Sequence, residues 1–279
     1  MLVSLIMPTL NRYDDIELLI QSLKVQTYKE FELIVVDQNE NNKVKAITNK
    51  YINDIDIKYI KSDKKGLSYN RNIGLDTAKG QIIAFPDDDC EYKVDTLEKV
   101  INFFNNTKEY RIYSCKTLEK GKDYGFGRML DNNSEITSLS VFDTVKSITF
   151  FVNYKNDDYL KFDENLGVGA KFGSGEESDY VLDLLDKGYK GKYFADDVVY
   201  HPAKKEGKSK EKYNRDYNYG RGFGALCKKQ IIHRKDYKFS SVMTKKIIRN
   251  LGGLLMGSDK DYHKATIKGR IQGFMQYKK

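Results

Sequence analysis

The sequence is poor in cysteine and histidine, and both shortages narrow the class of protein. Its 279 residues include three Cys, at positions 90, 115 and 227, an odd number without metal-type pairing. We therefore expect reduced thiols in a cytosolic compartment and no disulfide framework. Because there are also just three His and no Cys–His spacing, a structural zinc site is not expected.

Long apolar runs are missing as well. No stretch reaches about 18 apolar residues, so we expect no membrane-spanning helix. The N-terminal run Met1-Leu-Val-Ser-Leu-Ile-Met-Pro8 has no basic region before it and no small-residue cleavage site after it. This run is typical of a first strand and not of a signal peptide, which favours a cytoplasmic protein.

Charge is distributed unevenly along the chain. The net charge is +8, but residues 204–279 carry 21 Lys and Arg against 6 Asp and Glu, a net charge of +15. Residues 1–203 carry 27 basic and 34 acidic side chains, a net charge of −7. We expect a catalytic domain over 1–203 and a basic, mainly helical extension over 204–279. The extension suits an anionic partner, and charge alone leaves membrane and nucleic acid both open.

The first hundred residues alternate between strand and helix patterns, which is typical of βαβ units. We therefore expect an α/β fold with a mostly parallel sheet flanked by helices. Residues 116–147 predict a loop or a short hairpin. Strands are expected at 3–7, 31–37, 57–60, 81–85, 147–153 and 192–200. Helices are expected from residue 14, at 68–78, after residue 94 and at 180–187.

The segment Gln81–Cys90 is the most informative one, because a buried strand ends there in Asp87, Asp88 and Asp89. Adjacent carboxylates at a buried strand end repel one another and resist desolvation. A divalent cation among them would remove that repulsion, and oxygen ligands suit Mg²⁺ or Mn²⁺. For an Asp triplet taken alone, a solvated acidic turn that caps the next helix is the alternative.

Polar residues follow other predicted strands too. The carboxyl ends of strands in an open α/β sheet converge on one crevice, where ligands bind. One acid at such an end can be a helix cap, but polar residues at several successive ends indicate a site. These strand ends carry Pro8-Thr-Leu-Asn-Arg12, Asp37-Gln-Asn39, Asp87-Asp-Asp89 and His201.

The chain carries five motifs in the order Pro8-Thr-Leu-Asn-Arg12, Ile34-Val-Val-Asp37, Asn70-Arg-Asn-Ile-Gly74, Phe85-Pro-Asp-Asp-Asp89 and Gly175-Glu-Glu-Ser-Asp179. This set resembles family-2 glycosyltransferases of the bacterial surface-polysaccharide type, over roughly residues 1 to 202. The resemblance implies a GT-A fold, a nucleotide-sugar donor and inversion of the anomeric centre. It also implies hexosyl or N-acetylhexosaminyl transfer.

The resemblance implies roles for the strand-end residues. It assigns Asp89 to the metal, Mn²⁺ or Mg²⁺, and either Asp87 or Asp88 to the ribose, a choice that the triplet leaves open. His201 matches a histidine that in many GT-A enzymes is a further ligand of the metal or the diphosphate. The nucleotide pocket is expected to contain Pro8, Thr9, Asn11, Arg12, Asp37, Asn39 and Arg71, with Asp37 at the base and Arg71 near the nucleotide or its phosphates.

Inversion by direct displacement needs a carboxylate that takes the proton of the acceptor hydroxyl. The family usually supplies it from a Glu-Asp pair at the start of a helix, and the matching pair here is Glu176-Glu177. We expect Glu177 to be this base, with Glu176 and Asp179 as acceptor-side candidates. The alternative is that these acids merely favour the helix N-terminus.

The sequence therefore predicts a metal-dependent sugar transferase that uses a nucleotide-diphosphate sugar, with a UDP-sugar as first candidate, and a glycan or polyprenyl-linked acceptor. A nucleotidyltransferase is one alternative, but residues 8–12 lack the Gly-rich basic loop that such an enzyme would place after its first strand. A nucleic-acid-binding protein is favoured only by the basic extension, and the acidic body counts against it.

An apolar stripe in the extension predicts a peripheral position at the inner face of an anionic membrane. The alternative is that the stripe packs against the catalytic domain, and Gly252 and Gly253 weaken the helix. Basic side chains lie near the stripe at Lys245, Lys246 and Arg249. The stripe comprises Met243, Ile247, Ile248, Leu251, Leu254 and Leu255.

Overall fold

The computed structural model describes residues 1–125, 127–154, 159–202, 210–257 and 259–278. The chain divides into two compact units. Unit 1 comprises residues 1–65, 69–161 and 180–203, and unit 2 comprises residues 66–68, 162–179 and 204–279. Unit 2 thus takes in two internal segments besides its C-terminal part, and the predicted boundary at residue 203 stays a prediction.

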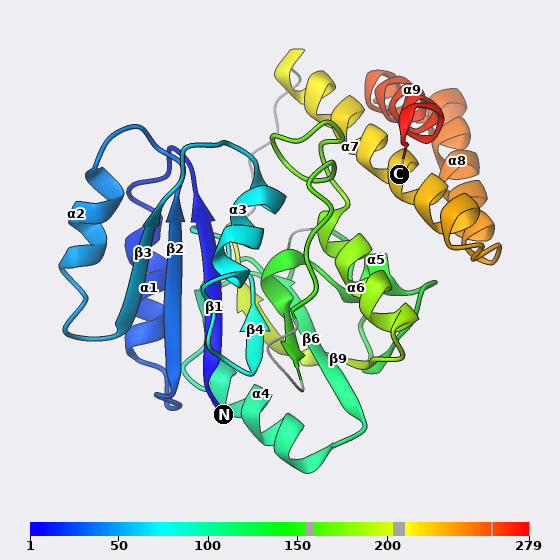
Figure 1. The fold of residues 1–279 in the computed structure, drawn as a ribbon. Coiled ribbons are helices and arrows are strands. Elements are labelled where there is room, and N and C mark those ends of the chain that lie inside the picture. Colours follow the sequence, from blue (N-terminus) through cyan, green and yellow to red (C-terminus); the bar gives the residue numbers. More distant parts are fainter. Residues whose placement is uncertain (126, 155–158, 203–209, 258, 279) are drawn as a thin grey trace. The chain divides into compact units, whose positions relative to one another are not determined.

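Within the described residues, unit 1 is built on a nine-stranded mixed sheet with the strand order β3-β2-β1-β4-β8-β6-β9-β5, and β7 pairs with β9 (Figure 1). The first four strands in this order are parallel. Beyond β4 the sheet becomes mixed, because β8 runs antiparallel to both β4 and β6. The strands are β1 (Val3–Thr9), β2 (Phe31–Asp37), β3 (Asp56–Lys61), β4 (Ile82–Ala84), β5 (Glu91–Tyr92), β6 (Tyr110–Leu118), β7 (Ser134–Ile136), β8 (Phe150–Asn153) and β9 (Lys190–Tyr200).

The core of unit 1 forms where helix α1 (Ile16–Lys24) packs on the sheet. Every residue of β1 and β2 is buried, which explains why apolar residues predominate in both strands. Alternate β1 residues share a core cluster with the helical stripe of α1, and each such buried side chain contributes about 1.5–3 kcal/mol. The other helices that include residues of unit 1 are α2 (Lys43–Asn49), α3 (Leu67–Leu75), α4 (Thr96–Asn106), α5 (Val141–Thr144) and α6 (Glu176–Asp186).

Helix α3 approaches β1 closely because residue 74 is glycine. A Cβ at Gly74 would lie 2.2 Å from Cγ2 of Ile6, so any larger residue would force the helix away from the sheet. The close packing buries Arg71, which has no exposed surface. The glycine of the Asn70–Gly74 motif therefore has a packing role, which helps to fix the arginine three residues before it.

Two sequence predictions for the middle of the chain were wrong. Residues 116–147 are not simply a loop or hairpin, because β6 extends to Leu118 and β7 pairs with β9. The strand predicted at 147–153 begins only at Phe150, after a short 3-10 turn. Strand β6 was missed because its buried side chains include Ser114, whose hydroxyl donates to the backbone oxygen of Thr144 at 2.7 Å. Such a satisfied polar residue breaks the apolar pattern of a buried strand.

The C-terminal part of unit 2 is helical in its described residues, as predicted. The segments are α7 (Lys210–Lys228), a π-helical turn (Lys229–His233), α8 (Phe239–Met256) and α9 (Lys260–Gln276). Glycines let α7 and α9 approach closely: a Cβ at Gly224 would lie 2.0 Å from the carbonyl oxygen of Arg270, and one at Gly273 would lie 2.0 Å from that of Arg221. The three cysteines are buried and free. Among the described residues, no helix has the combined length and apolarity needed to cross a membrane.

Candidate active site

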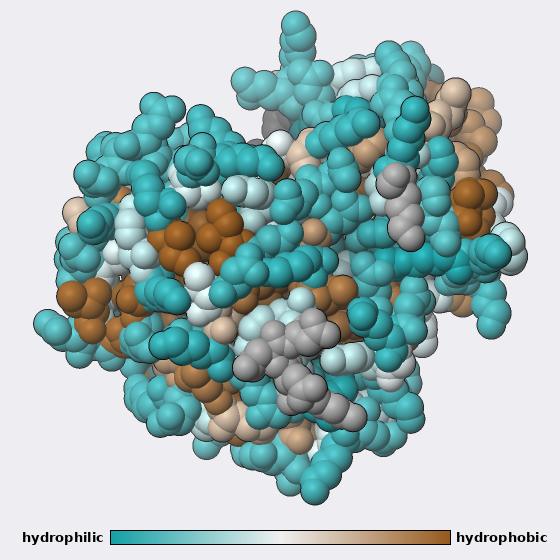
Figure 2. Space-filling model, viewed as in Figure 1, coloured by the Kyte–Doolittle hydropathy of each residue, from teal (hydrophilic) through white to brown (hydrophobic). Residues whose placement is uncertain are grey.

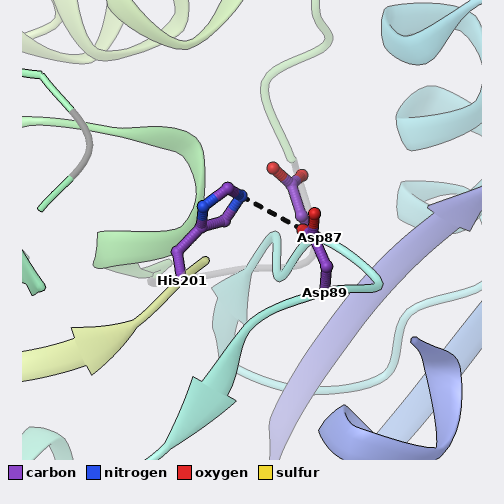
Figure 3. Close-up of side chains that lie close together, drawn as sticks. All are labelled: Asp87, Asp89 and His201. Carbon is purple, nitrogen blue, oxygen red and sulfur yellow. Dashed lines mark ion pairs between the residues drawn. The ribbon is translucent and has the colours of Figure 1, made fainter. Parts of the chain in front are cut away.

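The acidic triplet lies in the loop after β4, and His201 directly follows β9. Both lie in unit 1. Ligand atoms of Asp87, Asp89 and His201 all lie within 4.8 Å of one another, and Figure 3 shows the three side chains together. The predicted metal residues Asp89 and His201 are thus neighbours. Asp87 is the third member of this group, whereas the sequence predicted that either Asp87 or Asp88 contacts the ribose.

His201 is held between a backbone carbonyl and a carboxylate. Its Nδ1 lies 2.9 Å from the backbone oxygen of Pro202, which can only accept, so Nδ1 carries a hydrogen. Its Nε2 lies 3.1 Å from Oδ1 of Asp89. Burial alone would lower the pKa of His201, but the hydrogen bond to Asp89 and the charge of that carboxylate raise it above the ordinary 6.5. In the neutral form, the Nδ1 tautomer would leave Nε2 available to a metal.

Asp89 also contacts Arg12 of the first-strand motif. The Nη1 atom of Arg12 lies 2.5 Å from Oδ2 of Asp89 and 3.1 Å from Oδ2 of Asp15. Burial raises the pKa of Asp89, but His201 and Arg12 outweigh this effect and lower it to about 2. The carboxylate is therefore ionised at neutral pH, as a metal ligand must be.

Asp88 has a different environment from its neighbours. It is 8% exposed and accepts a hydrogen bond from Oγ1 of Thr9 at 2.7 Å. Burial raises its pKa to about 7, and repulsion by Asp87 and Asp89 adds to this effect, although Thr9 and Arg12 act in the opposite direction. The repulsion expected from the sequence therefore contributes to the raised pKa of Asp88.

Asp87 pairs with the buried arginine of α3. The Nη2 atom of Arg71 lies 3.3 Å from Oδ1 of Asp87, and its guanidinium carbon lies 5.9 Å from the ring centroid of Phe85. The Asp87 side chain is 34% exposed, whereas Arg71 is fully buried. The Asn70–Gly74 motif therefore reaches the same strand end as the triplet, and Arg71 brings a permanent positive charge there.

Asp37, at the end of β2, is fully buried and accepts four hydrogen bonds. Its Oδ1 accepts from the backbone and side-chain nitrogens of Asn39, at 2.8 and 2.7 Å. Its Oδ2 accepts from the hydroxyl of Tyr59 at 2.7 Å and from Nζ of Lys61 at 3.2 Å. These bonds fill the usual acceptor capacity of a carboxylate, so a nucleobase would have to replace one donor, and Lys61 is the most exposed of the three.

The remaining nucleotide candidates surround these acids. Asn11 has a φ of 59°, a left-handed conformation that asparagine tolerates better than most residues. Its backbone nitrogen donates to Oδ1 of Asn39 at 2.7 Å, which links the ends of β1 and β2. Pro8, in β1, is buried. The structure therefore brings the polar ends of β1, β2, β4 and β9 into one network, as the strand-end argument predicted.

The acids of the Gly175–Asp179 motif belong to unit 2. Gly175 has a φ of 93° directly before α6, so the chain turns sharply into the helix there. Glu176 is buried, and its carboxyl carbon would lie 3.2 Å from a Cβ at Gly167. Glu177 is half-buried and has more exposed surface than Glu176 or Asp179. Of the three acids, Glu177 is thus the most accessible to a second substrate.

Asp179 lies in a buried cluster of charges that the sequence did not reveal. Nζ of Lys229 lies 2.6 Å from Oδ2 of Asp179 and 3.3 Å from Oδ2 of Asp163. A guanidinium nitrogen of Arg234 lies 3.5 Å from Asp179, and Tyr277 donates its hydroxyl to Asp163 at 2.7 Å. Burial raises the pKa of Asp179, and the two cations oppose that shift. These contacts tie the first turn of α6 to the π-helical turn and the end of α9 within unit 2.

The donor chemistry of the Asp87–Asp89–His201 group fits a divalent cation. Two carboxylates and one imidazole are accepted by Mn²⁺, whereas Mg²⁺ strongly prefers oxygen. The buried Asp89 supplies an ionised oxygen, and the Pro202 carbonyl orients the imidazole, as expected around a metal ligand. The group therefore suits the divalent metal predicted from the sequence.

Known proteins resemble this chain in sequence. Two bacterial proteins are similar in sequence. One is a GalNAc(5)-diNAcBac-PP-undecaprenol beta-1,3-glucosyltransferase of Campylobacter jejuni, 31% identical over 159 residues, which are 55% of this chain and 51% of that protein. The other is the UDP-Glc:alpha-D-GlcNAc-diphosphoundecaprenol beta-1,3-glucosyltransferase WfaP of Escherichia coli, 32% identical over 183 residues, 61% of this chain and 72% of that protein. The match thus spans about half the length of the first relative.

Solved structures confirm the predicted fold class. TarS 1-349 of S. aureus in complex with UDP-GlcNAc has a TM-score of 0.70 at 20% identity and covers 98% of this chain and 82% of that chain. The mannosyltransferase PcManGT of Pyrobaculum calidifontis, in complex with GDP-Man and Mn²⁺, has a TM-score of 0.67 at 14% identity and covers 99% and 88%. The fold is that of GT-A enzymes. The family model for glycosyl transferase family 2 matches residues 4–166, more than half of the sequence. The chain therefore belongs to glycosyl transferase family 2.

Proposed function

We propose that the chain transfers a hexosyl or N-acetylhexosaminyl group from a UDP-sugar to a hydroxyl of a lipid-linked glycan, with inversion, in surface polysaccharide biosynthesis. The observation that carries this proposal is the convergence of Asp87, Asp89 and His201 at strand ends in a chain of this family. The names of both bacterial relatives support an undecaprenol-linked acceptor, and that of WfaP supports a UDP-sugar.

We assign a divalent ion, Mn²⁺ or Mg²⁺, to the Asp87–Asp89–His201 group. When bound, such an ion supplies positive charge that stabilises a diphosphate leaving group. The choice of Mn²⁺ as first candidate rests on the imidazole of His201 and is supported by the Mn²⁺ named for PcManGT. Asp89 would be the principal protein ligand, because it is buried and contacts His201 directly.

The nucleotide would be held by residues of unit 1. The guanidinium of Arg71 lies 3.3 Å from Oδ1 of Asp87, so it would contact a phosphate bound beside that carboxylate. Arg12 would do the same beside Asp89. Asp88 would reach the ribose in competition with Asp87, and Asp37 would accept from the base after Lys61 moves away.

Glu177 would accept the proton of the acceptor hydroxyl. Its partial exposure supports this choice, because Glu176 and Asp179 are buried and Asp179 is engaged by Lys229. The proton moves from the acceptor oxygen to the Glu177 carboxylate as that oxygen attacks the anomeric carbon and UDP leaves. Since the acceptors of the relatives are carried on undecaprenol, we also propose a cytoplasmic enzyme at the inner face of the plasma membrane.

A donor screen followed by a transfer assay tests this function. Thermal denaturation is first measured with Mn²⁺ and each of several nucleotide sugars, because a ligand that binds the folded state raises the midpoint. The donor selected in this way is then supplied with a polyprenyl-diphosphate sugar acceptor. We expect release of UDP and a product of inverted anomeric configuration. Release of pyrophosphate from a nucleoside triphosphate, with no sugar transfer, would instead indicate a nucleotidyltransferase.

A further inference from the structure

Helix α8 is the least buried long helix of unit 2. Of its 18 residues, only Phe239 and Asn250 are fully buried. In water a helix of this length is stabilised mainly by packing an apolar face, and α8 packs little of its surface within the unit. Brown and tan residues reach the surface over α8 in Figure 2.

The exposed side of α8 is apolar along one row. The spacing of three and four residues places Ile248, Leu251 and Leu255 on one face. They are 62%, 46% and 80% exposed, and Met256 beside them is 93% exposed. An isolated exposed leucine is ordinary, but four large apolar side chains on one helical face form an interaction surface.

A row of positive charge runs beside the apolar row. Lys245 and Arg249, four residues apart, are both exposed and adjoin the apolar face. The sequence of α8 contains no Asp or Glu, so this face has no acidic side chain of its own helix to balance the cations. The surface therefore combines apolar contact with attraction for anions.

We propose that this face of α8, comprising Lys245, Ile248, Arg249, Leu251, Leu255 and Met256, docks the enzyme on an anionic lipid bilayer. A helix of this pattern lies in the plane of the interface, with its apolar side chains about 5–10 Å into the headgroup boundary. The inference rests on the proposed function, because an acceptor carried on a lipid would be met at such a surface.

A second copy of the chain fits this face less well. In a two-fold symmetric dimer the same patch meets itself, so Lys245 and Arg249 of one copy would approach those of the other without an acid on α8 to offset them. Nucleic acid would satisfy the cations but not the apolar row. A bilayer with anionic headgroups satisfies both rows at once.

Vesicle flotation with the full chain tests the proposal. The probes are phosphatidylcholine vesicles with and without phosphatidylglycerol. We expect flotation with the anionic vesicles at about 0.1 M salt and its loss at about 1 M, where the screening length falls to about 3 Å. Leu255→Ser should weaken partitioning by about tenfold. Lys245→Glu should weaken it by at least about fivefold, because one nearby cation contributes roughly that factor.

Matched variants in unit 1 serve as controls. Leu18, on α1, is 50% exposed, and Lys108, which follows α4, is exposed. Leu18→Ser and Lys108→Glu should float as the wild type does. No flotation of the wild type at low salt, or equal losses in the control variants, would overturn the proposal. The proposal would also be overturned if the wild type were a dimer that binds no vesicles and Leu255→Ser were a monomer. That result would mean that the face joins two copies of the chain.

A second readout separates docking from catalysis. Sugar transfer to a water-soluble acceptor should be unchanged in Leu255→Ser and Lys245→Glu, whereas transfer to a vesicle-borne acceptor should fall with partitioning. Vesicle binding without transfer to any acceptor would contradict the proposed function and would still support the docking face.

Discussion

The Nε2 atom of His201 lies 3.1 Å from Oδ1 of Asp89, and both side chains are less than a tenth exposed. In this arrangement the protonated imidazole is a cation held against the carboxylate. A divalent ion bound by the same two atoms would replace that proton. The pair therefore links metal binding, protonation and the charge of the acidic triplet.

Metal-dependent binding of UDP should weaken as the pH falls through the pKa of His201. That pKa is raised above 6.5, so the proton competes with the metal for Nε2 at and below near-neutral pH. Calorimetric titration of UDP in the presence of Mn²⁺ over a pH series measures the effect. The variant His201→Asn should bind more weakly and lose this part of the pH dependence. An unchanged pH profile in the variant would show that His201 is not a ligand.

The His201–Asp89 pair should also make the stability of the metal-free fold depend on pH. Low pH favours this stability, whereas it weakens metal binding. Because the folded-state pKa of His201 is raised, the pair stabilises the metal-free fold fully below the ordinary histidine pKa of about 6.5. That contribution is lost as the pH rises through the raised value. In the metal-bound protein, this dependence should disappear.

Asp88→Asn should stabilise the metal-free protein at neutral and alkaline pH. Burial raises the pKa of Asp88 from 3.8 to about 7, so the folded state holds a proton that the unfolded chain has released. Stability attributable to Asp88 therefore falls as the pH rises from about 4 to 7. Asparagine keeps an acceptor for Thr9 and cannot ionise. Thermal denaturation in chelator should give equal midpoints near pH 4 and a higher midpoint for the variant above pH 7, and a pH-independent difference would contradict this account.

Glu177→Gln should reduce turnover by roughly 10²–10⁴ while binding of UDP stays normal, because glutamine cannot accept the proton. Steady-state kinetics and calorimetry measure the two quantities. The controls are Glu176→Gln and Asp179→Asn. Normal turnover in Glu177→Gln together with an inactive control variant would assign the base to another carboxylate.

Lys229→Met should destabilise the fold by about 3 kcal/mol, because it leaves the buried Asp179 and the partly buried Asp163 short of a cation. The matched control is Lys24→Met, which breaks an exposed pair with Asp54 and should cost less than about 1 kcal/mol. Urea unfolding of the metal-free proteins compares the two. Equal losses would mean that the Asp179 cluster does not stabilise unit 2.

The parallel core of the fold could be predicted because its signals are local. Strands β1 and β2 are mainly apolar and end at polar residues, and α1 carries an apolar stripe at helical spacing. Strand β6 could not, since Ser114 is buried through hydrogen bonds to residues far along the chain. The local spacing of apolar residues predicts which of them are buried. It does not predict the burial of a polar residue whose hydrogen-bond partners lie far along the chain.

Some features of the candidate site could likewise be predicted from the sequence and others could not. The strand-end pattern gathered Asp89, Arg12 and His201 at one edge of the sheet, and the structure places them in contact. It did not indicate that burial would raise the pKa of Asp88 to about 7, or that four donors surround Asp37. The sequence did not predict the cluster of Asp163, Asp179 and Lys229. This cluster depends on packing between segments of which two, those of Asp163 and Lys229, carry no recognisable motif.

Removal of Asp89 would do more than relieve repulsion within the triplet. Crowded acids suggest that removing one relieves repulsion, but Asp89 is the carboxylate with two cationic partners, Arg12 and His201. Its loss would leave both without that anion. The substitution Asp89→Asn keeps the shape and a hydrogen-bond acceptor, and is therefore the better test of metal binding than truncation to alanine.

Calorimetric titration of UDP into the wild type and Asp89→Asn, each with Mn²⁺ and with excess chelator, tests the central claim most directly. We predict binding only by the wild type with Mn²⁺, with circular dichroism showing that both proteins are folded. Equal affinity of the wild type for UDP in chelator, or wild-type affinity in Asp89→Asn, would contradict a metal-dependent nucleotide site at Asp87, Asp89 and His201.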